Sequence, residues 1–230
     1  MSNEPITETK RPGNTNDQII PYYVLRVLIG AAGMSLPLLL VAGKLIFNNS
    51  FEIEYSISDY YDNGTAGDIL VGILFALAFF LVSYRGYAAI DSIAANLGCV
   101  FALGVALCPT TSDVKAVHIL HFVFAILLFS VFIFFSMYLF RKSDPKSKTK
   151  TKKKKERNAV YLVCGIIMII CIVFIALISL TKFLNEQSIK LHLVFWLESI
   201  ALASFGFSWI TKAEVLFLKD SDSPKEKLEE

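Results

Sequence analysis

The sequence predicts an all-α membrane protein, a polytopic bundle of six transmembrane helices with both termini in the cytoplasm. Of its 230 residues, 55% are hydrophobic and only 18% are charged, and the mean hydropathy is +0.57. The charges are clustered, so they leave apolar runs of the roughly 20 residues that a membrane helix needs. Such runs are too long for the strands of a membrane barrel.

The stretches between charges define the six expected spans. The first contains Pro37 and ends near Lys44, a residue expected to extend its ammonium toward the membrane surface. The third carries a small residue at every fourth position, a pattern that lets another helix approach closely. The spans are expected at about 22–47, 68–84, 90–109, 115–140, 159–181 and 190–211.

Lysine and arginine set the expected orientation. Ten basic residues fall in or next to the segment 142–157, which is therefore expected to be a cytoplasmic loop. Alternation of the spans then gives a disordered cytoplasmic tail at 1–20 and a charged cytoplasmic tail at 215–230, around a membrane domain at 21–214. The connections at 48–67, 110–114 and 182–190 fall outside, where acidic residues predominate.

All three histidines of the chain are expected at the outer ends of helices. His118 and His121 begin the fourth span and His192 begins the sixth. Three imidazoles that leave one position for water are the ligands of a catalytic zinc ion, so these are the candidate metal ligands. Candidate catalytic groups on the same side are Ser56 or Ser58 as an orienting serine and Asp59 as a nearby carboxylate that could act as a general base. Glu198 is a further candidate, a carboxylate inside an apolar run.

Each of these residues also has a simpler interpretation. A histidine at a helix end is commonly an interfacial polar residue, and Glu198 could lock two helices together. The four cysteines lie within apolar runs without a CxxC pair, which is typical of small residues in membrane helices.

Three short motifs carry a resemblance to known proteins. YSISDYY (55–61), SYRGY (83–87) and ESIALASFGFSWITKA (198–213) are similar to a family of bacterial integral membrane proteins without a settled activity. This resemblance covers about residues 20–214 and implies a compact helical membrane domain.

The serine, aspartate and histidines also distantly resemble the superfamily of alkaline ceramidases, adiponectin receptors and Per1-type proteins. That resemblance implies zinc held by His118, His121 and His192, with Asp59 and Ser56 or Ser58 beside it. The superfamily has seven helices, a Ser-x3-His motif and a His-x3-His motif. This chain departs from it with six spans, a His-x2-His pair and no histidine in the early motif.

The sequence therefore leaves three functions open. The first is a non-enzymatic structural or sensory protein, the second is a zinc-dependent lipid amidase or esterase, and the third is a small-solute transporter. The expected location is a bacterial inner membrane, and the expected partners are membrane lipids and no nucleic acid. The basic segment 142–157 is expected to contact anionic headgroups.

Overall fold

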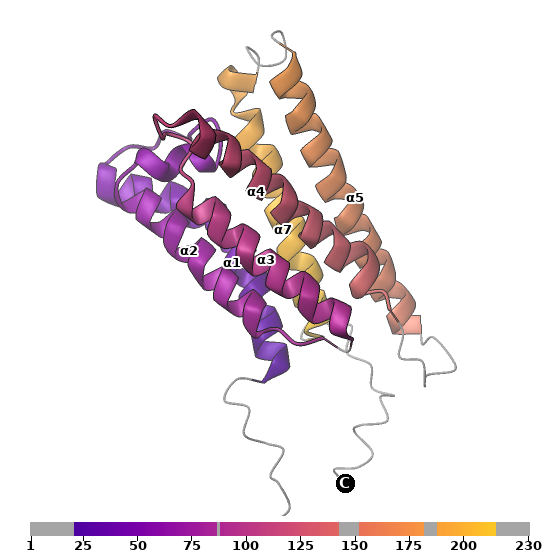
Figure 1. The fold of residues 1–230 in the computed structure, drawn as a ribbon. Coiled ribbons are helices and arrows are strands. Elements are labelled where there is room, and N and C mark those ends of the chain that lie inside the picture. Colours follow the sequence, from indigo (N-terminus) through magenta and orange to yellow (C-terminus); the bar gives the residue numbers. More distant parts are fainter. Residues whose placement is uncertain (1–20, 87, 143–151, 182–187, 215–230) are drawn as a thin grey trace, which may run out of the picture.

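The computed structural model describes residues 21–86, 88–142, 152–181 and 188–214, and all regular structure in these ranges is helical (Figure 1). The described part of the chain contains six helices long and apolar enough to cross a membrane, as the sequence predicts. They are α1 (Tyr22–Asn48), α2 (Thr65–Ser83), α3 (Ala89–Leu107), α4 (Lys115–Phe134), α5 (Lys152–Leu180) and α7 (Leu193–Lys212).

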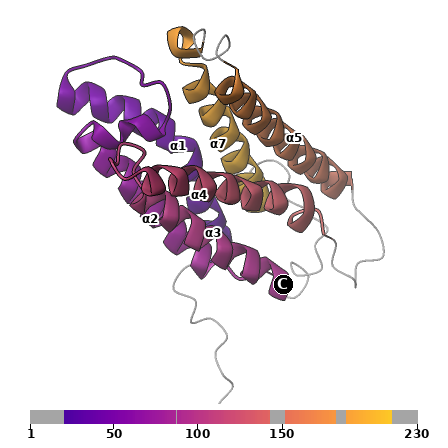
Figure 2. The same ribbon diagram turned by 45° about the horizontal axis from the view of Figure 1, so that its top comes forward.

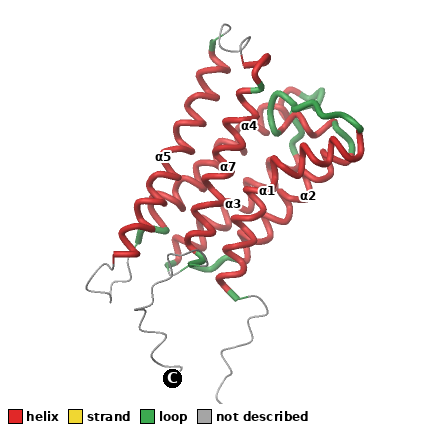
Figure 3. The backbone as a smooth tube through the Cα atoms, turned by 180° about the vertical axis from the view of Figure 1, so that it is seen from behind, coloured by secondary structure: helices red, strands yellow, loops and turns green. Residues whose placement is uncertain are grey.

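Two short elements accompany these helices. A 3-10 helix, η1 (Ser58–Asp62), lies in the connection between α1 and α2, and a π-helical stretch, η2 (Phe135–Leu139), extends α4. The loops on the described chain gather at two ends of the bundle (Figure 3). We call the end that carries η1 the η1 end, and the end where α5 begins with its lysine run the basic end.

The helices follow one another around the bundle in the order α5, α7, α1, α2, α3 and α4. Helices α1 and α7, from opposite ends of the chain, therefore lie side by side (Figure 2). The two helices approach each other closely at two glycines, since a Cβ on Gly30 would lie 2.7 Å from the Gly206 carbonyl oxygen. Small residues thus let two backbones pack closely.

Helix α3 buries the predicted stripe of small residues. Ala94, Gly98, Ala102 and Ala106 are all buried, and a Cβ on Gly98 would meet Leu81 of α2 and Val131 of α4 at 3.2 and 3.3 Å. The interpretation of this stripe as a packing surface is confirmed.

Helix α4 is held to its neighbours near the basic end. The Ser136 hydroxyl donates a hydrogen bond to the Tyr161 carbonyl of α5 at 2.8 Å, and the Phe132 ring stacks on Phe205 of α7 at 3.7 Å. Trp209 is fully buried there among Tyr84, Phe135 and Phe140. This aromatic core joins α2, α4 with η2, and α7.

The helix boundaries differ from the expected spans by a few residues, and the largest difference is at the start of α5. Helix α5 begins at Lys152, so the lysine run forms its first turns and does not belong to a loop. The expected tails at 1–20 and 215–230 and the middle of the basic segment, 143–151, lie outside the described residues.

Candidate functional site

The connection between α1 and α2 folds into a turn held by Ser56 and Asp59. The Ser56 backbone N–H donates to Asp59 Oδ2 at 3.0 Å, and the Asp59 N–H donates to Ser56 Oγ at 3.2 Å. This reciprocal pair is the geometry of a capping box, which satisfies backbone groups at the start of a helical turn. Ser56 Oγ also lies 3.0 Å from Ser58 Oγ. The structure therefore places the predicted catalytic serine and acid in the turn that forms η1.

Burial raises the pKa of the Asp59 carboxyl above its ordinary value of 3.8, and the hydrogen bonds from Ser56 work in the opposite direction. The charge of Glu54 raises this pKa further and that of His121 lowers it. Asp59 is thus a half-buried acid within the electrostatic range of two neighbouring titratable groups.

Glu198 connects α7 to this turn. Its Oε2 accepts a hydrogen bond from the Ile57 backbone N–H at 2.6 Å, across 141 positions of sequence. The Phe195 N–H, also in α7, donates to the Tyr55 carbonyl at 2.9 Å. The predicted carboxylate therefore helps to hold the connection against the membrane helices.

Tyr61 fixes the other side of η1. Its hydroxyl donates to the Val105 carbonyl of α3, and its ring meets the edge of His121 with centroids 5.8 Å apart. Burial raises the pKa of the Tyr61 hydroxyl, which therefore stays protonated and acts as a donor. This residue was not among the predicted site residues.

His118 and His121 both bond to the chain that precedes α4. Nδ1 of His118 lies 2.7 Å from the Thr110 carbonyl oxygen, and Nδ1 of His121 lies 2.7 Å from the Cys108 carbonyl oxygen. Because a carbonyl oxygen only accepts, Nδ1 carries the hydrogen in each ring, and Nε2 of the neutral ring is an acceptor. His118 is exposed, whereas His121 is buried.

His192 occupies a separate position. It precedes α7 with a left-handed backbone (φ 50°) and lines a surface hollow with Phe51, Glu52, Ile53 and Glu54. Among the described residues, histidine, cysteine, aspartate and glutamate form no group of three that could hold one metal ion. The zinc site stays a prediction from the sequence.

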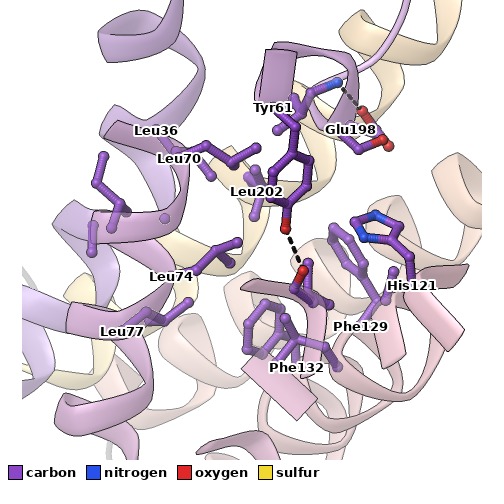
Figure 4. A pocket seen from close by; sticks show the side chains of 18 residues that line it. Leu36, Tyr61, Leu70, Leu74, Leu77, His121, Phe129, Phe132, Glu198 and Leu202 are labelled. Carbon is purple, nitrogen blue, oxygen red and sulfur yellow. Dashed lines mark hydrogen bonds between the residues drawn. The ribbon is translucent and has the colours of Figure 1, made fainter. Parts of the chain in front are cut away.

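A cavity lies between the helices directly beneath η1 (Figure 4). Its empty volume is about 650 Å³, including open space at its mouth. Ser58, Tyr61, His121 and Glu198 supply the polar side chains of its lining. The remaining lining is apolar and comes mainly from α1, α2, α4 and α7, including Leu36, Leu70, Leu74, Leu77, Ala125, Phe129, Phe132 and Leu202.

An ion pair stands beside this site. The Lys44 ammonium of α1 bonds to Glu54 Oε1, and Lys44 is only 6% exposed. The expectation that Lys44 extends its ammonium toward the membrane surface stays a prediction. A carboxylate in the following loop turns the side chain inward, because a buried ammonium is stable only when paired.

Comparison with models of protein families, with curated proteins and with solved structures finds no match for this chain.

Proposed function

We propose that this chain is a non-enzymatic, sensory membrane protein that binds one aliphatic chain of a lipid-like molecule in the cavity beneath η1. The observation that carries the proposal is that one end of the cavity is polar and the rest is apolar. The polar side chains come from η1 and the nearby ends of α4 and α7. An apolar pocket with a few polar groups is typical of a ligand site. The division matches an amphiphile whose polar end lies under η1.

The length of the cavity supports an aliphatic chain. Both His121 and Phe132 line it, and Phe132 follows His121 by eleven residues along α4. At about 1.5 Å per residue this distance is about 16 Å. The hydrocarbon core of a bilayer is about 30 Å thick. The cavity is therefore about as deep as one leaflet.

The contacts of Glu198 suggest how occupancy could be sensed. Its carboxylate lines the cavity and at the same time accepts the Ile57 N–H of the η1 connection. A polar ligand group that reaches Glu198 competes with this bond or reorients it. Binding would thus change the position of the η1 connection relative to the helices. A partner outside the membrane could bind to the changed connection.

We also propose the orientation that lysine and arginine favour. In it the basic end and both termini face the cytoplasm, and η1 faces the outside of a bacterial inner membrane. The lysines that begin α5 then lie where they attract anionic headgroups.

Photo-crosslinking tests the proposed binding. Purified protein in lipid nanodiscs is loaded with a hexadecyl chain that carries a terminal diazirine, and the labelled peptides are mapped. We expect labels on the cavity-lining residues of α2, α4 and α7 in the wild type. Ala125→Phe, which fills the cavity from α4, abolishes these labels.

The matched control is Val123→Phe, on the same helix at a position that is 43% exposed and outside the cavity lining. It leaves the cavity labels unchanged. Labels confined to exposed lipid-facing residues in all three proteins would contradict the proposed binding.

Metal content tests the alternative of a zinc-dependent amidase or esterase. The proposed function predicts no stoichiometric zinc in protein purified without chelators, and the same result for His118→Ala/His192→Ala. About one zinc per chain in the wild type, lost in a folded double variant, would instead support the hydrolase.

A further inference from the structure

The polar end of the cavity contains a carboxylate that has no cationic partner among the described residues. Glu198 is half-buried in α7 and lines the cavity. The ion pairs between described side chains are Lys44–Glu54 and Arg157–Glu214, so no described lysine or arginine pairs with Glu198. Its one recorded hydrogen bond comes from the Ile57 N–H, which satisfies part of the capacity of a carboxylate.

The charges around Glu198 do not compensate for it. Asp59 is near enough for its negative charge to act on Glu198, and Lys44 is engaged with Glu54. A carboxylate removed from water is costly unless a cation or several donors face it. An ionised Glu198 therefore has no compensating cation among the described residues, and a ligand that brings a cation would supply it.

The neighbouring polar groups are mostly acceptors as well. Nδ1–H of His121 is used by the Cys108 carbonyl, so the neutral ring has no N–H left to give to a ligand. The Tyr61 hydroxyl hydrogen is used by the Val105 carbonyl. Apart from the Ser58 hydroxyl, which can donate or accept, these side chains offer a ligand acceptors, so a donating ligand group fits them best.

We infer that the ligand is a long-chain amine, with an ammonium group against Glu198 and one aliphatic chain in the cavity. An ammonium donates three hydrogen bonds and accepts none, which matches this arrangement of acceptors. A bond between an ammonium and a carboxylate is also about twice as strong as a neutral one. A fatty acid, by contrast, would place a second carboxylate beside Glu198 and Asp59. This inference rests on the proposed function.

Three probes of equal chain length separate charge from apolar binding. Hexadecylamine, hexadecanol and hexadecanoate compete with the diazirine probe on the full chain in nanodiscs of uncharged lipid. We expect wild-type protein to prefer the amine to the alcohol by about tenfold, the size of one charge-assisted hydrogen bond. The fatty acid should compete least.

Glu198→Gln removes the charge and keeps an oxygen that can accept the Ile57 N–H. In this variant the preference for the amine over the alcohol should be lost. The control is Glu52→Gln, an exposed acid at the η1 end, which keeps the preference. Thermal unfolding of each variant shows whether it is folded.

The outcomes distinguish the two proposals. Equal competition by all three probes in the wild type, or an amine preference that survives Glu198→Gln, overturns the amine while leaving an aliphatic chain in the cavity. Failure of every probe to compete, with no cavity labelling, overturns the proposed function itself.

Discussion

At the scale of single residues, the polar groups at the η1 end have two roles. They hold the connection between α1 and α2 in place, and they form the candidate site. Ser56 and Asp59 bond to each other's backbone, and Asp59 is the acid of this pair. Its pKa is raised by burial. The folded protein therefore holds the Asp59 proton more tightly than the unfolded chain does.

This difference predicts a pH dependence of stability. The contribution of Asp59 is fully present below its ordinary pKa of 3.8 and is lost as the pH rises through the raised value. Asp59→Asn, which can still accept the Ser56 N–H, should abolish this decline. Thermal unfolding in detergent between about pH 3 and about pH 7 measures it. Identical pH profiles for wild type and variant would contradict the assignment.

The ion pair between Lys44 and Glu54 gives a second prediction at this scale. Lys44→Met leaves Glu54, whose side chain is 27% exposed, without its cation. We expect the free energy of unfolding to fall by about 1–2 kcal/mol, less than for a fully buried pair because water reaches Glu54. Glu54→Gln and the double variant Lys44→Met/Glu54→Gln complete a double-mutant cycle. If the pair stabilises the loop, the double variant loses less than the sum of the single losses.

Part of this residue-scale arrangement was readable from the sequence. Ser56 and Asp59 have the spacing of a capping box, which indicates a turn as directly as a catalytic pair. The bond between Ile57 and Glu198 was not readable, because it joins positions 141 residues apart. The pairing of Lys44 with Glu54 was not readable either, since it depends on how the loop folds back onto α1.

At the scale of elements, the membrane helices were predicted better than their ends. Apolar length determines where a chain can cross a bilayer, and six runs met that requirement. The start of α5 at Lys152 was missed because hydropathy finds the apolar part of a helix, whereas lysine is itself a good helix former. The π-helical stretch at Phe135–Leu139 has no signal in the apolar pattern either.

The crossing of α1 and α7 predicts a strong effect from a single methyl group. A Cβ on Gly206 would collide with Met34 and with the Gly30 carbonyl oxygen, a backbone atom that cannot turn away. Gly206→Ala should therefore lower the free energy of unfolding by about 1–3 kcal/mol.

The control for this change is Gly72→Ala on α2, where a Cβ would meet nothing within 4 Å. It should leave the free energy of unfolding unchanged or raise it slightly, because alanine favours a helix more than glycine does. Chemical unfolding of both variants in the same detergent makes the comparison. Equal effects at the two glycines would show that α1 and α7 do not cross at this point.

At the scale of the whole molecule, the proposed orientation joins the charge distribution to the candidate site. If the basic end faces the cytoplasm, the polar end of the cavity and η1 lie toward the outside, where a sensor would meet its ligand. Asp113, exposed at the η1 end, and Lys152, exposed at the basic end, are suitable markers. In a background without the four native cysteines, Asp113→Cys should react with a membrane-impermeant maleimide in intact cells. Lys152→Cys should react only after permeabilisation, because lysine-rich segments stay on the cytoplasmic side. The opposite pattern would place η1 in the cytoplasm, and the amine would then have to reach Glu198 from the inner leaflet.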